Sequence, residues 1–309
     1  MRGPRIVCLG GGTGLSTVLR GLKAVGQEPT AIVTLTDDGG SSGRLRRDLD
    51  IPPPGDVRAC LVALAEDESF MGHMFQHRFT RGELAGHNLG NLFLAALTEL
   101  AGSFDEAIAL TSHALAIAGE VLPATREPAG LVAEMEDGRV VAGESAVASD
   151  RSRVRRLRLE PSTPEAHPGA VSAIERADLI VLGPGSLFTS TLPPLLVPAI
   201  RDAVLASSAR RVYVANLLQQ PGETIGYNAG NHLDRLVQHV GAGIVHTVLV
   251  PHVRRLSTEL IPVDFDRAAL GRRDVEVVSA HMTQGHHHDP VALARVLVRQ
   301  SRRPMVRTA

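Results

Sequence analysis

The fold of this 309-residue chain is decided by the stretch Ile6-Val7-Cys8-Leu9-Gly10-Gly11-Gly12-Thr13-Gly14. Its apolar first half is typical of a buried strand, and the helical pattern of Leu15–Val25 follows directly. Glycines permit a tight turn and let backbone N–H groups approach an anion with no side chain in the way. The start of a helix adds unpaired N–H groups and a partial positive charge. We therefore predict a strand, a phosphate-binding turn over residues 10–14 (the first glycine loop) and a helix.

Further apolar runs of the same kind recur along the chain, separated by stretches of helical pattern. They are apolar throughout rather than alternating, as expected of strands covered on both faces. Strands that alternate with helices predict an α/β protein with a doubly wound, mainly parallel sheet. The predicted strands are Ile6–Leu9, Ala31–Leu35, Leu179–Leu182, Arg211–Ala215, Thr247–Val250 and Val275–Ser279. The predicted helices are Leu15–Val25, Asp56–Ala65, Leu89–Leu100, Asp105–Leu115, Leu195–Leu205, His232–His239 and Pro290–Arg299.

The alternation is interrupted between about residues 56 and 176, so we predict a single domain over residues 1–309 with a helical and β subdomain inserted there. The first part of the insertion, Asp56–Leu115, has a helical pattern. The second part contains a turn signal at Glu136–Arg139. The arginines of its last strand are expected to form a solvated face that protects a sheet edge, rather than a nucleic-acid patch. The predicted strands of this part are Leu131–Met135, Val140–Ala142 and Arg153–Leu159.

Composition narrows the class of protein. The chain is 44% hydrophobic and 21% charged with a net charge of -1, which argues against a disordered protein and against nucleic-acid binding as its main role. No apolar run approaches the ~20 residues that cross a bilayer, and the N-terminus lacks the pattern of a secretory signal. Cys8 and Cys60 are the only cysteines and form no C-x-x-C pair. We therefore expect a cytoplasmic protein without a transmembrane segment.

Polar residues follow the second predicted strand, where the carboxyl ends of strands line the ligand crevice of an open α/β sheet. Asp37 and Asp38 could accept hydrogen bonds from sugar hydroxyls or hold Mg²⁺ beside phosphate oxygens, which makes them the candidate catalytic and metal-binding residues. Ser41 and Ser42 add hydroxyl groups, and Arg44 can pair with a phosphate. The alternative is a simple turn, because Asp, Gly and Ser favour turns.

Three further segments contribute candidates for ligand binding. Arg58 lies in the first turn of a predicted helix, where a cation opposes the helix dipole, and a ligand phosphate would account for it; Asp56 is a reasonable N-cap of that helix. In Gly86-His87-Asn88-Leu89-Gly90-Asn91, either Asn88 or Asn91 could contact a base, or the segment could simply cap a helix.

The segment Gly183-Pro184-Gly185-Ser186 (the second glycine loop) repeats the combination of strand and glycine turn, so we predict that Gly183, Gly185 and Ser186 face phosphate. Asn216 follows another strand, where an amide could contact a base.

Three other features of the sequence are weak evidence for a functional site. His286-His287-His288-Asp289 looks metal-binding, but adjacent histidines point in different directions and no further ligand is evident. Cys60 has apolar neighbours and is expected in the core. Ser186 does not lie in the Gly-x-Ser-x-Gly pattern of a nucleophile elbow.

Five blocks, in order along the chain, resemble the YvcK group of the CofD-like superfamily, whose members are often called gluconeogenesis factors. The similarity runs from about Ile6 to Gly226. The blocks are Gly10-Gly11-Gly12-Thr13-Gly14-Leu15-Ser16, Asp37-Asp38-Gly39-Gly40-Ser41-Ser42-Gly43-Arg44, Pro53-Pro54-Gly55-Asp56-Val57-Arg58, Gly86-His87-Asn88-Leu89-Gly90-Asn91 and Leu182-Gly183-Pro184-Gly185-Ser186-Leu187-Phe188-Thr189-Ser190.

The resemblance implies a Rossmann-like fold, a cytoplasmic location, and a role in bacterial cell shape and envelope synthesis that is most visible on gluconeogenic carbon sources. It also implies binding of UDP-sugars, chiefly UDP-N-acetylglucosamine, without an established reaction. The matching loops at residues 10–14, 37–44 and 183–186 would carry the nucleotide. We also expect a homo-oligomer and, as further partners, proteins of envelope synthesis.

The sequence also departs from the family pattern. Ala59 stands where the family usually has Asn. Pro251–Glu259 is short and brings no tyrosine before Pro262-Val263, so we expect the ligand preference to differ from the family pattern there. His287 stands where relatives tend to carry a cation.

These observations lead to three hypotheses about the function of the protein. The first is a UDP-sugar-binding regulator rather than an enzyme, because no convincing nucleophile, metal cluster or acid–base pair is present. The alternative is a CofD-like transferase that moves 2-phospho-L-lactate from a guanosine diphosphate-linked donor to a deazaflavin alcohol, with Mg²⁺ at Asp37 or Asp38 stabilising the phosphoryl group. The third, a nicotinamide oxidoreductase, is disfavoured, because the glycine spacing would need Gly or Ala at Thr17 and no acidic residue lies ~20 positions after the loop.

Overall fold

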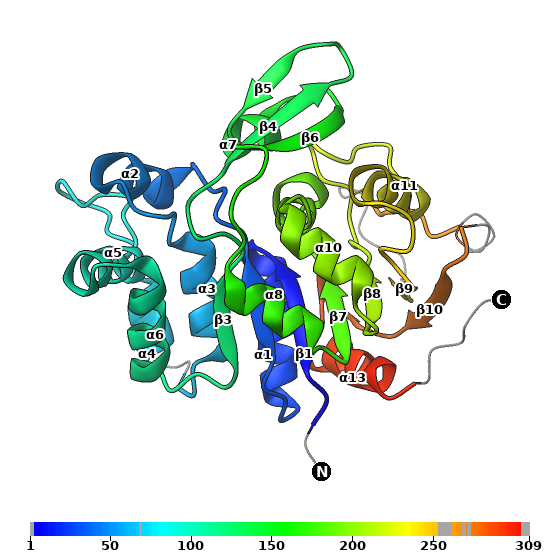
Figure 1. Cartoon of the computed structure of the whole chain (residues 1–309), viewed down its shortest axis with the longest axis horizontal. Coiled ribbons are helices and arrows are strands. Elements are labelled where there is room, and N and C mark those ends of the chain that lie inside the picture. Colours follow the sequence, from blue (N-terminus) through cyan, green and yellow to red (C-terminus); the bar gives the residue numbers. More distant parts are fainter. Residues whose placement is uncertain (1–2, 68–69, 253–260, 267–269, 271–272, 304–309) are drawn as a thin grey trace.

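The computed structural model describes residues 3–67, 70–252, 261–266, 270 and 273–303 (Figure 1). Its centre is a seven-stranded sheet in the order β10-β9-β8-β7-β1-β2-β3, and every neighbouring pair is parallel. The predicted doubly wound, Rossmann-like α/β fold is confirmed. The strands are β1 (Ile6–Gly10), β2 (Thr30–Val33), β3 (Glu120–Pro123), β7 (Leu179–Leu182), β8 (Arg210–Val214), β9 (Thr247–Pro251) and β10 (Glu276–Ala280).

The strand order reverses between β1 and β7. From β1 the chain builds outward to β2 and β3, and from β7 it builds in the opposite direction to β8, β9 and β10. In register, Leu9 lies opposite Leu182 on one side, and Gly10 lies opposite Val33 on the other. The two glycine loops therefore leave neighbouring strands at the reversal point, which is where open α/β sheets bind ligands.

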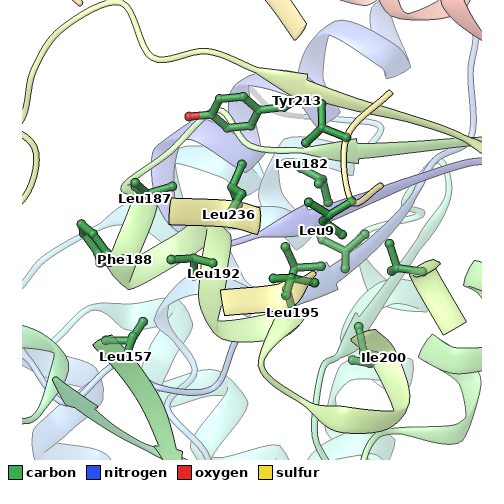
Figure 2. Close-up of a cluster of buried hydrophobic side chains, with 14 of the residues drawn as sticks. Leu9, Leu157, Leu182, Leu187, Phe188, Leu192, Leu195, Ile200, Tyr213 and Leu236 are labelled. Carbon is green, nitrogen blue, oxygen red and sulfur yellow. The ribbon is translucent and has the colours of Figure 1, made fainter. Parts of the chain in front are cut away.

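The strand side chains alternate between two hydrophobic cores. Ile6 and Cys8 face α1 (Gly12–Ala24), α3 (Gly55–Leu64) and α13 (Pro290–Ser301). Val7 and Leu9 face the other core, shown in Figure 2 with Leu182, Phe188, Leu195 and Tyr213. Cys60 is fully buried, as predicted. That second core is covered by α8 (Pro168–Glu175), the π-helix η1 (Leu187–Thr191), α9 (Leu192–Leu195), α10 (Pro198–Ala206) and α11 (Ala229–Val240).

Two elements near the first half of the chain were not predicted. Strand β3 lies within the segment that we treated as an insertion and forms an edge of the main sheet. It has only four residues, begins with an exposed Glu120 and ends at Pro123, so it lacks the long apolar run of the other strands. Helix α2 (Gly40–Leu49) starts inside the segment that we read as a loop; its glycines and charged residues hid the helical pattern.

Helices α4 (Phe70–Gln76), α5 (Leu89–Ala101) and α6 (Phe104–Ala114) gather with α2 on the β3 side of the sheet (Figure 1). None of the helices in the described ranges is both long and apolar enough to cross a membrane.

A separate antiparallel sheet lies beyond the carboxyl ends of the main strands (Figure 1). Its order is β5-β4-β6, formed by β4 (Gly130–Met135), β5 (Val140–Ala142) and β6 (Val154–Glu160), as the turn signal predicted. Strand β6 is an edge with exposed arginines, one of which, Arg155, pairs with Glu134 at 3.0 Å. The short helix α7 (Glu144–Ser149) follows β5, and the hairpin of β11 (Thr283–Gln284) and β12 (His287–His288) precedes α13.

Candidate functional site

The two glycine loops touch each other. A β-carbon placed on Gly14 would overlap the carbonyl of Pro184, so only glycine allows this approach. Asn216, two residues after the end of β8, fixes the second glycine loop. Its Oδ1 accepts from the N–H of Gly185 at 3.2 Å, and its Nδ2 donates to the carbonyl of Gly185 at 2.8 Å. The structure therefore brings together three segments that the sequence singled out separately.

A pocket of about 280 Å³ opens between these loops. Thr13 and Gly14 form one wall, at the start of α1, and Gly185 with Asn216 forms another. Gln220 also lines it and donates from Nε2 to the hydroxyl of Ser186 at 2.8 Å. Asn216 Nδ2 also donates to Gln220 Oε1 at 3.2 Å, so the side-chain amides mainly hold the second glycine loop in place. The N-terminus of α1 is the part of the wall with the donor chemistry that a phosphate group requires.

Three histidines complete the pocket, and sequence reasoning gave them little weight. His286, His287 and His288 lie on its wall, although they are 270 residues or more from the first glycine loop in sequence. Burial lowers the pKa of His288 to about 4, so its ring is neutral at pH 7. Its ring nitrogens lie near the carbonyls of Met282 and Ala215, but neither nitrogen has hydrogen-bond geometry with a partner.

Asp56 occupies a place that we did not expect. It was predicted to cap α3, but the N-cap residue is Pro54, and no side chain caps this helix; that prediction was wrong. The Asp56 carboxylate instead accepts from the N–H of Gly12 and lies against Gly11. Burial and the charge of Asp37 raise the pKa of Asp56 to about 6. A carboxylate of the chain itself therefore holds one amide of the first glycine loop.

Other carboxylates crowd the same edge of the sheet. Asp37 accepts from the N–H of Gly39 at 2.9 Å, and Asp38 accepts from the N–H of Ser145, in the first turn of α7, also at 2.9 Å. Glu144 accepts from the Thr36 hydroxyl at 2.6 Å. Burial raises the pKa of Glu144 to about 8, and the charges of Asp56, Asp37 and Asp38 add to the effect. The sequence around Glu144 gave no signal for this position, because it reaches the site only through the fold.

The four carboxyl groups of Asp37, Asp38, Asp56 and Glu144 are the ones that could attract a cation, because the charge of Asp37 raises the pKa of Asp56 and the charges of the three aspartates raise the pKa of Glu144. In the part of the chain that the structure describes, no group of three or more His, Cys, Asp or Glu side chains has an arrangement suited to a metal ion. Three of the four carboxylates, those of Asp37, Asp38 and Asp56, already accept hydrogen bonds from backbone N–H groups.

The other predicted ligand residues form a separate polar cluster where α2 meets α5. The hydroxyl of Ser41 bonds to His87 Nδ1 at 3.2 Å, and Ser42 accepts from Asn91 Nδ2 at 3.4 Å. Arg58 donates to Asn91 Oδ1 at 2.8 Å. Arg44 donates to the carbonyl of Ala85 at 2.9 Å.

Asn88, also in this polar cluster, acts as the N-cap of α5. Its Oδ1 accepts from the N–H groups of Gly90 and Asn91 at 3.0 and 3.3 Å, and its Nδ2 donates to the carbonyl of Gln76. None of Ser41, Ser42, Arg44, Arg58 or Asn88 is among the residues that line the pocket between the glycine loops. Of the segment that lacks the family tyrosine, residues 253–260 lie outside the described residues.

Comparisons with known proteins identify the family and the fold of this chain. The chain matches the family described as 2-phospho-L-lactate transferase CofD over residues 6–283. It is 46% identical to the gluconeogenesis factor of Bacillus subtilis strain 168, covering 96% of this chain and 97% of that protein. It is 51% identical to the gluconeogenesis factor of Halalkalibacterium halodurans over 81% of this chain and 78% of that protein.

A crystal structure of a UPF0052 family member from Bacillus halodurans superposes with a TM-score of 0.93 at 44% identity, covering 96% of this chain and 99% of the other. Fold, sequence and length therefore agree along nearly the whole chain. The protein belongs to the CofD family and, within it, to the YvcK/UPF0052 group of gluconeogenesis factors.

Proposed function

We propose that the pocket between the two glycine loops binds a nucleotide diphosphate-linked sugar of the UDP-N-acetylglucosamine type. The observation that carries the proposal is the contact between Gly14 and Pro184, which joins two glycine turns from neighbouring strands around one pocket. Backbone N–H groups from Thr13 and Gly14 would face the diphosphate, where the partial positive charge of α1 favours it.

The rest of the pocket wall is suited to the neutral parts of such a ligand. Gln220 offers hydrogen bonds without a formal charge, and the low pKa of His288 keeps the ring of that lining residue neutral at pH 7. Sugar hydroxyls and a uracil ring present donors and acceptors of the same kind. The wall therefore supports an uncharged group attached to a diphosphate.

We further propose that the protein works as a regulator of cell shape and envelope synthesis during gluconeogenic growth. The names of its relatives support the link to gluconeogenesis. A bound sugar nucleotide would report the supply of envelope precursors to protein partners. Cytoplasmic location and homo-oligomerisation stay predictions of the sequence.

Isothermal titration with UDP-N-acetylglucosamine tests the proposal. Saturable binding that is lost in Gly14→Ala but kept in Gly130→Ala supports it, because a β-carbon on Gly130 meets nothing closer than 3.5 Å. Absence of heat at millimolar ligand, with the protein folded by circular dichroism, would reject it.

The second candidate is the CofD-type transfer of 2-phospho-L-lactate from a guanosine diphosphate-linked donor, with Mg²⁺ at the carboxylates of the sheet edge. The family match over residues 6–283 favours it. Asp37 would be the residue to hold the cation. Burial is the main cause of the raised pKa of Glu144, and Mg²⁺ would offset the charges of Asp56, Asp37 and Asp38 that add to it. Incubation with donor, deazaflavin alcohol and Mg²⁺ should then give a phospho-lactyl product, and Asp37→Asn should abolish it.

A further inference from the structure

A second pocket, of about 300 Å³, lies between the start of β6 and the outer face of α11. We call it the arginine pocket; its main lining residues are Arg153, Tyr227, Asn231, Asp234, Arg235 and Gln238. It shares no lining residue with the pocket between the glycine loops. It therefore needs an explanation of its own.

Tyr227 holds two arginines in place. Its ring is buried at 4% exposure, and the guanidinium carbons of Arg153 and Arg235 each lie 5.8 Å from the ring centroid. Arg235 also donates from Nε to the Tyr227 hydroxyl at 3.1 Å. Cation–π contacts of this kind fix an arginine while leaving its N–H groups free to bind other partners.

Arg153 carries a charge that no carboxylate of the described ranges neutralises through an ion pair, and its side chain is exposed. Arg235, in contrast, pairs with Glu136 at 3.0 Å. Gly226 has φ +82°, and a β-carbon there would come within 2.6 Å of Arg153 Nη2, so a glycine leaves room for this guanidinium. The arrangement presents one unneutralised cation at the pocket.

Two side-chain amides of the lining, those of Asn231 and Gln238, supply further donors. The Oδ1 of Asn231 is engaged by the N–H of Asn228, and the Oε1 of Gln238 is engaged by Arg235 Nη1. Each side-chain amide therefore has its NH₂ group left for a ligand. Asp234, the acidic residue of the lining, is bound at both oxygens by Arg273, each at 2.8 Å.

We propose that the arginine pocket binds a small phosphate monoester, as a site additional to the sugar-nucleotide site. A phosphate monoester carries close to two negative charges at pH 7 and three terminal acceptor oxygens, which match several donors around one free arginine. A carboxylate has two oxygens and one charge, so it would satisfy fewer of them. The pocket volume of about 300 Å³ leaves space for the small organic group that the phosphate esterifies.

The chain supplies its own reporter for this site. It has no Trp and two tyrosines, Tyr213 and Tyr227, of which Tyr213 is buried in the core and Tyr227 lies in the pocket. Protein labelled with 3-fluorotyrosine gives one ¹⁹F resonance for each, and Tyr227→Phe assigns them. Titration with glycerol 3-phosphate should shift the Tyr227 resonance saturably, with a Kd of about 1 mM or tighter.

Two variants test whether the Tyr227 response depends on the arginine pocket. Arg153→Gln should weaken the Tyr227 response about tenfold or more, since a charge-assisted hydrogen bond is lost. Arg158→Gln changes an exposed arginine on β6, the strand that follows Arg153, and should leave the Tyr227 response unchanged. An unchanged Tyr227 response in Arg153→Gln would show that the guanidinium does not bind the phosphate and would overturn the proposal. An equal response to succinate at matched ionic strength would overturn the phosphate assignment, and no Tyr227 response would overturn both.

Discussion

Gly14 and Pro184 lie so close that a β-carbon on Gly14 would overlap the Pro184 carbonyl. The two residues are far apart in sequence and come from turns that follow neighbouring parallel strands. Their contact joins the two glycine loops, and the candidate pocket lies beside it. Backbone packing at this point therefore sets the shape of the site.

Gly14→Ala should force the two loops apart. We expect a loss of about 1–3 kcal/mol in the free energy of unfolding, because there is no space for the added carbon, together with loss of sugar-nucleotide binding. Urea denaturation and calorimetric titration measure the two effects. Gly130→Ala is the control, since its new carbon makes only ordinary contacts. Unchanged stability in Gly14→Ala would contradict the packing described here.

Asn216→Asp should impair the second glycine loop. The Nδ2 donor to the Gly185 carbonyl is lost, and a negative charge is added beside the proposed diphosphate site. We expect a loss of about 1–3 kcal/mol in the free energy of unfolding and at least tenfold weaker nucleotide binding. Equal affinity in the variant and the parent protein would separate Asn216 from the binding site.

Asp56→Asn tests the carboxylate at the first glycine loop. In EDTA at pH 8, where Asp56 is ionised, removing its charge should tighten binding of a diphosphate about tenfold. With Mg²⁺ present, the same substitution should weaken binding if this edge of the sheet holds the cation. Calorimetric titration under both conditions measures the effect, and identical affinities throughout would place the diphosphate away from Asp56.

Glu144 should make stability depend on pH. Its pKa is raised to about 8 in the folded protein, so the folded state holds a proton that the unfolded state loses near pH 4.5. The stabilisation is present in full below pH 4.5 and is lost as pH rises through 8, with a slope of at most ~1.4 kcal/mol per pH unit. Glu144→Gln should flatten this part of the profile and stabilise the protein at pH 8. If the free energy of unfolding depends on pH in the same way in the parent protein and in Glu144→Gln, the raised pKa of Glu144 is contradicted.

Asn88→Ala distinguishes a helix cap from a ligand contact. Loss of the bonds to Gly90 and Asn91 should lower the free energy of unfolding by about 1 kcal/mol. Nucleotide affinity should not change, because Asn88 does not line the pocket between the glycine loops. A drop in affinity at unchanged stability would return Asn88 to the binding site.

The local sequence predicted much of the fold. Apolar runs marked six strands of the main sheet, and the turn signal at residues 136–139 marked the small sheet. The local sequence did not predict β3 or α2. Strand β3 has four residues and ends in proline, and helix α2 is rich in glycine and charged residues, so neither has a periodic apolar pattern.

By itself, the sequence determined where backbone could turn tightly and which strands would be buried, since both properties belong to short stretches of residues. Only the tertiary structure decided which side chains share a site. Asp38 reaches Ser145 across 107 residues, and the histidines of β12 reach Thr13 across most of the chain. Such contacts depend on strand order and on the direction of each side chain, and covalent neighbours specify neither.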